Sequence, residues 1–150
     1  MIVLNKIGAA SKISIERLEK KYNLRLPSDY QAFLLNTNGG SVNINEYNQL
    51  PVNGLTEKVV VDVLYGIDTG HEAANIDFWT DKLQSDLPAK TIIIGDSIMH
   101  GLFIMICRDE MQGIYYWDDS YHFETSTDEN NTYWIADSFS DFMDLFEEHK

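Results

Sequence analysis

The stretch Leu26-Pro27-Ser28-Asp29-Tyr30, followed a little later by Asn38-Gly39-Gly40, decides how the first part of this chain folds. Pro27 fixes φ near the helical value and lacks the N–H that the first turn of a helix leaves unpaired. Asp29 places negative charge near the positive end of the helix dipole. The glycine pair tolerates positive φ, which ends a helix and turns the chain. This segment therefore predicts a short helix with its own start and stop signals.

Working outward, the apolar pattern predicts elements along the whole chain. Helices are expected over 11–22 with Ser11 or Ser14 as the cap, from Pro27, over 72–84 and after a cap at Ser138, and strands over 58–65, 91–95, 101–107, 113–117, 121–125 and 133–135. The strand-rich middle is joined by short turns, whereas parallel neighbours would need crossovers of a dozen residues or more. We therefore expect an α+β fold: a single domain over 1–150 with a largely antiparallel central sheet flanked by helices.

Four later segments join the opening one in a distinctive order. They are Leu64-Tyr65-Gly66, Ile92-Ile93-Ile94-Gly95-Asp96 leading to Gly101, Tyr115-Tyr116-Trp117-Asp118, and Ile135-Ala136-Asp137-Ser138-Phe139 with Phe142. With the leading amphipathic helix, the set resembles the SUKH superfamily, the Smi/Knr-like domains, over about 11–148. The resemblance implies that fold. In bacteria, most members resemble immunity proteins that bind and neutralise a toxin, often a nuclease, whereas others look like regulatory or scaffolding modules.

The charge is strongly negative and unevenly distributed. The net charge is -13, although the first 30 residues carry six basic and three acidic side chains. Between Asp109 and Glu148 there are twelve acidic residues and neither lysine nor arginine. Such a field repels phosphate backbones and attracts basic proteins. Direct nucleic-acid binding is therefore disfavoured. The alternative to a basic protein partner is that the excess of acidic residues only keeps the domain in solution.

Composition also predicts the compartment. The single Cys107 has no partner for an internal disulfide, so a reducing compartment is the simplest home. The start of the chain lacks a signal pattern, and no apolar run reaches the length needed to span a bilayer. We expect a cytoplasmic protein without membrane contact. The sequence leaves open whether it forms a homodimer.

Catalytic patterns are weak. Gly95-Asp96-Ser97-Ile98-Met99 begins like a nucleophile elbow, but Met99 stands where the closing glycine belongs. We therefore expect the Gly95-Asp96 pair and Gly101 to turn the chain between two strands. Cys107 ends an apolar strand, where a thiol is usually a small core side chain rather than a nucleophile. Its conceivable imidazole partners are His71, His100, His122 and His149.

Metal and cofactor patterns are equally thin. His122 and Glu124 would share one face of a strand, but a zinc site needs at least one further protein ligand. There is no CxxC pair, phosphate loop or dinucleotide-binding glycine pattern. We expect no cofactor, no metal and no catalytic residues.

A protein-binding surface is the better-supported candidate. Aromatic residues between Tyr115 and Phe123 lie close in sequence to acidic ones, and aromatic anchors within a polar rim are typical of interfaces. The alternative is that these rings all pack inward. The residues expected to contact a partner are Asp118, Asp119, Tyr121, Glu124, Asp128 and Glu129.

These observations predict a non-enzymatic immunity protein that blocks the active site of a cognate, basic toxin, with a nuclease as the expected target. The alternative is a regulatory or scaffolding module without a toxin partner. A third class, a small-ligand binder or hydrolase, would require a deep pocket with convergent polar groups and shifted pKa values.

Overall fold

The helices and the longer strands follow the apolar pattern of the sequence, whereas the short strands over 4–6, 40–42 and 49–50 were not predicted. A computed structural model describes residues 4–6, 10–42, 49–50, 52, 58–98, 101–108, 110–118 and 131–148. The strands are β1 (Leu4–Lys6), β2 (Gly40–Val42), β3 (Gln49–Leu50), β4 (Val59–Leu64), β5 (Thr91–Ser97), β6 (Leu102–Ile106), β7 (Gly113–Trp117) and β8 (Thr132–Ala136). The helices are α1 (Lys12–Lys21), α2 (Ser28–Asn36), α3 (Ile76–Leu83) and α4 (Phe139–Glu148), with 3₁₀ turns η2 (Glu72–Ala74) and η3 (Gln84–Asp86).

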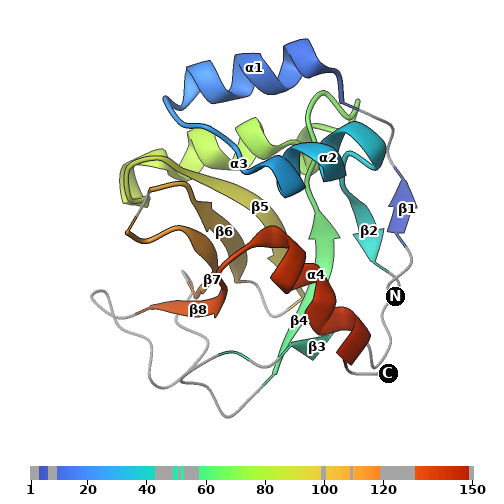
Figure 1. The fold of residues 1–150 in the computed structure, drawn as a ribbon, viewed down its shortest axis with the longest axis vertical. Coiled ribbons are helices and arrows are strands. Elements are labelled where there is room, and N and C mark those ends of the chain that lie inside the picture. Colours follow the sequence, from blue (N-terminus) through green and yellow to red (C-terminus); the bar gives the residue numbers. More distant parts are fainter. Residues whose placement is uncertain are drawn as a thin grey trace.

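The strands form one antiparallel sheet in the order β1-β2-β4-β5-β6-β7-β8, and β3 pairs with β4 off this path (Figure 1). Every side chain of β6 is buried, as expected for a strand at the centre of a covered sheet. The predicted α+β class and antiparallel sheet are confirmed. Within the ranges given above, no helix combines the length and the apolar character that crossing a bilayer requires.

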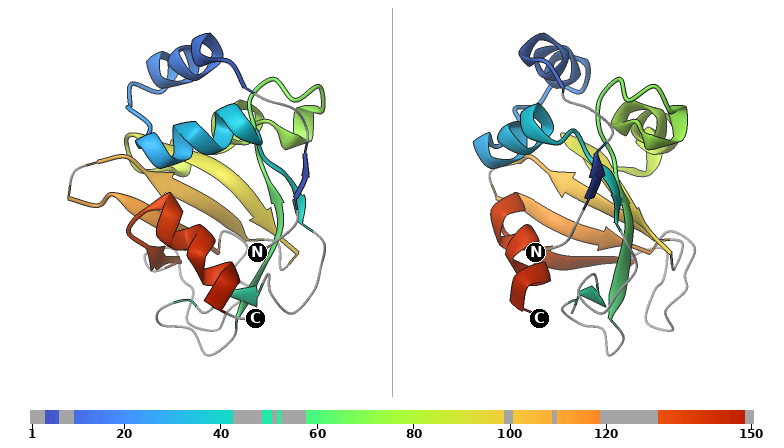
Figure 2. Two further views of the ribbon diagram at one scale, coloured as in Figure 1. Left: turned by 45° about the vertical axis from the view of Figure 1, so that its right-hand side comes forward. Right: turned by 90° about the vertical axis from the view of Figure 1, so that its right-hand side faces the viewer.

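Helices cover both faces of this sheet. Figure 2 shows α2 and α4 on one side and α3 on the other, with α1 at the end of the molecule beyond α2. On the α4 side, the ring of Phe142 lies 5.7 Å from that of Phe103 in β6, and the ring of Phe139 lies 4.8 Å from that of Tyr30 in α2. These buried rings contribute apolar area and favourable tilted packing.

The predicted helix signals are confirmed. Ser11 caps α1 in a reciprocal box with Ser14, and Asn38 and Gly39 both adopt positive φ after α2. The Ser138 hydroxyl accepts the N–H of Asp141 at 3.0 Å and so caps α4. These signals act between neighbours in sequence, which is why they were readable.

The helix predicted over 72–84 is wrong as a continuous element. It is broken at Asn75, which has extended φ and ψ of -97° and 134° between η2 and α3. Asn75 forms a parallel bridge with Gly66, and its side-chain oxygen accepts the N–H and hydroxyl of Thr69. These contacts compete with helical hydrogen bonds and hold the residue extended.

The turn predicted at Gly95-Asp96 is also wrong, because both residues lie inside β5. Strand pairing continues to Ser97, whose N–H donates to the carbonyl of Gly101 at 2.9 Å. An extra residue in β5, Ile94, produces a bulge opposite β6 instead. The strand predicted over 121–125 lies outside the described residues.

Candidate functional site

A pocket of about 630 Å³ opens between α3 and the β4-β5-β6 part of the sheet. Its polar walls include Asp62 from β4, Asp96 from β5 and Lys82 from α3. Helix α3 is held at this position because the Thr80 hydroxyl accepts the N–H of Ile93 at 3.0 Å. After β4 the chain leaves the sheet, and α3 lies along this edge of β5 instead of a strand. The Thr80 hydroxyl therefore supplies the hydrogen bond that a neighbouring strand would otherwise supply to Ile93.

A β-bulge brings the two carboxylates to one pocket. Val61 pairs with Ser97 and Val63 with Asp96, so Asp62 is an extra residue in β4. Strict alternation would turn Asp62 to the face opposite Val63 and its partner Asp96. The bulge breaks this alternation, and Asp62 and Asp96 line the same pocket.

The Asp96 carboxylate is only partly compensated. Its Oδ2 accepts the Tyr65 hydroxyl at 2.6 Å, whereas its Oδ1 is buried and has no hydrogen-bond partner among the described residues. Burial raises the pKa of Asp96, as does the nearby charge of Asp62. The hydroxyl of Tyr65 and the N–H of Val63 oppose that rise in pKa. The balance is a raised pKa, so the site holds negative charge at some expense in free energy.

Aromatic rings form the wall beside these acids. The rings of Tyr65 and Trp79 stack with centroids 5.9 Å apart and an angle of 7° between their planes. The Trp79 indole N–H donates to the carbonyl of Ala73 at 2.9 Å, which fixes the ring. The Lys82 ammonium lies 5.4 Å from the centre of the Trp79 ring, within cation–π range.

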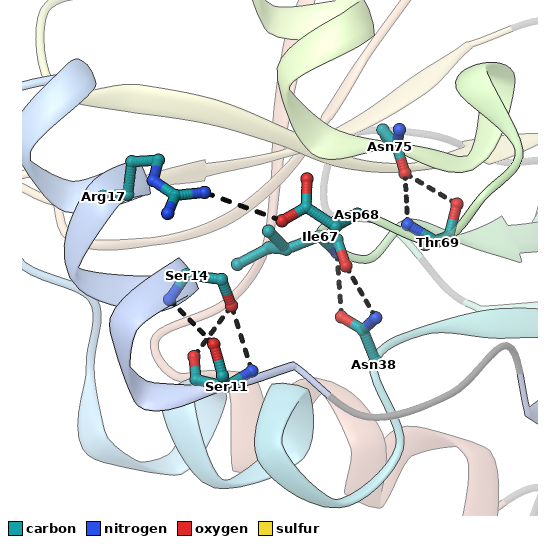
Figure 3. A network of polar contacts seen from close by, with 8 residues as sticks. All are labelled: Ser11, Ser14, Arg17, Asn38, Ile67, Asp68, Thr69 and Asn75. Carbon is teal, nitrogen blue, oxygen red and sulfur yellow. Dashed lines mark hydrogen bonds and ion pairs between the residues drawn. The ribbon is translucent and has the colours of Figure 1, made fainter.

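A buried asparagine holds the connection that carries Tyr65 and α3 (Figure 3). The side chain of Asn38 donates to the carbonyl of Ile67 at 2.9 Å and accepts its N–H at 2.8 Å. Both backbone groups of Ile67 are thus satisfied inside the protein. Beyond this clamp, Thr69 and Asn75 bond to each other, and Arg17 of α1 pairs with Asp68 at 3.9 Å.

Two of the motif segments touch at this clamp. A Cβ on Gly66 would lie 2.1 Å from the backbone oxygen of Asn38, and one on Gly39 would lie 2.4 Å from that of Leu64. Only glycine allows the backbones to approach this closely. The motif glycines therefore let the end of α2 dock against the end of β4.

The site predicted from sequence is only partly described. Asp118 is fully buried (0% exposed), and its N–H donates to the carbonyl of Asn131 at 2.8 Å. Its carboxylate does not face solvent in this arrangement, which sequence reasoning did not anticipate. The other predicted contact residues, Asp119, Tyr121, Glu124, Asp128 and Glu129, lie outside the described residues. Partner contact by this set stays a prediction.

The neighbouring aromatics do not alternate between buried and exposed positions, because both faces of β7 are largely covered. Tyr116 and Trp117 are buried, and Tyr115 is half-buried, with its hydroxyl donating to the carbonyl of Met111 at 2.9 Å. Tyr115 lies opposite Trp134 of β8, which is 41% exposed. The part of the aromatic set that the structure describes is therefore mostly core.

The weak catalytic patterns have structural explanations. Ser97 is buried inside a strand rather than exposed on a strand-to-helix turn. Burial, with a smaller contribution from Glu19, raises the pKa of Cys107 to about 12. His71 is exposed, and His100, His122 and His149 lie outside the described residues. Among the residues described, no three His, Cys, Asp or Glu side chains gather as metal ligands would.

Sequence reasoning missed the pocket, although a signal was present. Tyr65 belongs to one family-like segment, Asp96 and Gly101 belong to another, and all three residues line the pocket. Taken separately, these segments predict strands and turns. Their convergence on one cavity emerges only from the sheet order, which places β4, β5 and β6 side by side.

The fold and this site define an α+β domain with an acidic, aromatic-walled pocket beside a central antiparallel sheet. A family model, the SMI1 / KNR4 family (SUKH-1), matches residues 9–145. The chain belongs to the SUKH-1 family. A comparison with curated proteins gives no match.

Proposed function

We propose that this protein is a bacterial, cytoplasmic immunity protein that binds a cognate toxin and covers its active site. Membership of the SUKH family, a domain commonly associated with toxin immunity, carries the proposal. On this proposal the protein acts by binding rather than by turnover. The expected target is a basic toxin, with a nuclease as the expected activity.

The charge distribution supports a basic partner. The chain has a net charge of -13, and the twelve acidic residues between Asp109 and Glu148 have no lysine or arginine among them. Nucleases bind phosphate through basic surfaces, so carboxylates of an inhibitor can occupy the place of the substrate's phosphates. Complementary charge speeds encounter and burial of apolar groups slows dissociation.

Co-expression with the toxin encoded beside this gene tests the proposal. We expect growth to be restored and the two purified proteins to elute together in size-exclusion chromatography. Isothermal titration should give a saturable one-to-one complex. Continued killing, together with the absence of a complex, would count against the immunity function.

A regulatory or scaffolding role is the second proposal, since the family resemblance includes such modules. It uses the same fold and needs no toxin. Gene order separates the two, because an immunity gene is expected immediately beside a toxin gene.

The pocket supports a third proposal, a small-ligand binder or hydrolase. Sequence analysis required a deep pocket with convergent polar groups and shifted pKa values for a small-ligand binder; this pocket brings Asp62, Asp96 and Lys82 together, and the pKa of Asp96 is raised by burial. A screen of metabolites by thermal shift distinguishes this class, because a protein that binds only macromolecules should show no stabilisation.

A further inference from the structure

We propose that the pocket between α3 and the β4-β5-β6 strands receives the guanidinium group of an arginine side chain presented by the protein partner. The inference rests on the proposed function and adds the chemistry by which one partner residue is recognised. None of the described residues that line this pocket belongs to the acidic segment beginning at Asp109.

The charge of the pocket favours a cation. Asp62 and Asp96 meet in the pocket because of the bulge in β4, and among the described residues that line it Lys82 is the basic one. Two carboxylates and one ammonium leave a single formal negative charge when both acids are ionised. Asp96 Oδ1 has no hydrogen bond among the described residues, so this charge is under-compensated within the fold. A cation lying against the pair would supply what is missing.

The shape of the pocket favours a planar cation. The partly exposed ring of Trp79, which stacks on the fully buried ring of Tyr65, offers a flat aromatic surface next to the acids. A planar guanidinium stacks on such rings and can face two carboxylates at once, whereas an ammonium is a compact and more strongly hydrated charge. Leu83 and Leu102 supply apolar lining for the alkyl part of the side chain. These features favour arginine over lysine.

Lys82 sets the affinity of the pocket. Its ammonium already lies over the rings of Phe78 and Trp79, at 5.8 and 5.4 Å from their centres. It is exposed and can swing toward solvent when another cation arrives. It therefore competes with the arginine, and its removal should tighten binding.

Titration with a blocked amino acid tests the pocket without any toxin. N-acetyl-arginine amide is added to the ¹⁵N-labelled protein, with the neutral isostere N-acetyl-citrulline amide and the lysine derivative as comparisons. We expect saturable shifts of the Trp79 indole signal and the β5 amides with the arginine compound. The citrulline compound should bind roughly tenfold more weakly or worse. Equal binding of arginine and citrulline, shifts located elsewhere, or no saturation in tens of millimolar would overturn the proposal.

Variants test whether each charged side chain of the pocket strengthens or weakens arginine binding. Asp96→Asn retains the acceptor for Tyr65 but should weaken arginine binding roughly tenfold, and Asp62→Asn should do likewise. Lys82→Gln should tighten it severalfold. The matched control, Asp144→Asn, removes the same charge from an exposed position on α4 and should leave binding unchanged. Binding by Asp96→Asn as tight as that of the parent would refute the assignment, as would a loss in the control of the same size.

The same variants separate this inference from the proposed function. If the toxin binds the parent and Asp96→Asn equally well, the immunity function stands and the arginine pocket falls. If the parent binds no toxin, the immunity function falls, while the titration with the arginine compound still decides the chemistry of the pocket.

Discussion

At the scale of single residues, Asp96 combines partial burial with a second carboxylate nearby. Burial and Asp62 raise the pKa of Asp96, and the Tyr65 hydroxyl lowers it without restoring the usual value. A group held in this way lowers the stability of the folded state whenever it is ionised. Binding sites often contain such groups, because the feature that attracts a ligand is unfavourable without one.

Replacement of Asp96 by asparagine should therefore stabilise the protein at neutral pH. A raised folded-state pKa means that folding favours the protonated carboxyl, so the penalty is present above the folded pKa and vanishes below the unfolded value. Thermal unfolding should show a melting temperature higher by a few degrees at pH 7, and the difference should shrink toward zero as the pH falls below about 3.9. Lys82 contributes opposite charge and is present in both proteins. A lower melting temperature for Asp96→Asn at pH 7 would contradict this explanation.

Cys107 should be a poor nucleophile in the folded protein. Its pKa of about 12 leaves on the order of one thiol in ten thousand ionised at pH 8. Alkylation by iodoacetamide should thus be at least about 100-fold slower than for a free cysteine, and should become fast in urea. Mass spectrometry follows both reactions, and rapid labelling of the folded protein would show that the thiol is activated.

At the scale of elements, single side chains join segments that are distant in sequence. Asn38 links the end of α2 to the chain after β4, and Asp29 links α2 to the start of α4. Figure 1 shows how these helices lie against the sheet. Because each link satisfies backbone groups, its loss should lower the free energy of unfolding of the whole domain.

Substitution of Asn38 by alanine should lower the free energy of unfolding by about 3 kcal/mol or more. It leaves the buried N–H and carbonyl of Ile67 without their partners, and it places alanine at a φ of 53°. Urea unfolding measures the change. Asn36→Ala, at an exposed position of α2, is the matched control and should change stability by less than about 0.5 kcal/mol.

Substitution of Asp29 by alanine should cost about 1–2 kcal/mol. The Asp29 Oδ2 atom accepts the N–H of Ser140 at 2.8 Å and its hydroxyl at 3.0 Å, so α2 supplies a second cap to α4. Asp144→Ala, at an exposed position within α4, should have little effect on the same unfolding curve. Equal losses in the two variants would indicate a general charge effect rather than capping.

The elements that could be predicted have signals within a few residues of their ends. Pro27, Ser11 and Ser138 mark helix starts because their effects are local. The break at Asn75 was missed because its cause is a bridge to Gly66 across the connection from β4. The pocket was missed for a related reason. The extra residue at position 62 leaves the apolar pattern of the strand unchanged, but it turns the side chain of Asp62 toward the face that carries Asp96.

At the scale of the whole molecule, charge and fold are separable. The basic residues gather in the first 30 positions, while the acidic excess lies downstream. Such asymmetry sets how a partner approaches more than how strongly the core packs. The fold itself depends on the buried sheet and the rings around Phe142.

Neutralising the predicted acidic contact set should slow association with the toxin. The variant carries Asp119→Asn, Glu124→Gln, Asp128→Asn and Glu129→Gln. We expect the association rate at low salt to fall roughly tenfold and its dependence on ionic strength to weaken. Stopped-flow fluorescence measures both quantities.

The control for that variant removes equal charge from exposed positions elsewhere. It carries Glu16→Gln, Glu72→Gln, Asp86→Asn and Asp144→Asn. Its association rate should fall less, because local charge steers more effectively than distant charge in salt. Identical losses in the two variants would mean that net charge alone guides the encounter.

The bulge in β4 gives this strand an unusual tolerance to shortening. Deletion of Asp62 would leave Val61 opposite Ser97 and Val63 opposite Asp96, so a regular ladder would close with no residue changing sides. Deletion of Val60 would instead move the side chains of part of the strand to the opposite face of the sheet. Deletion of the Asp62 codon would thus remove one of the two pocket carboxylates and keep the fold. A related protein can therefore change the charge of its binding pocket, and with it its partner, by a single deletion.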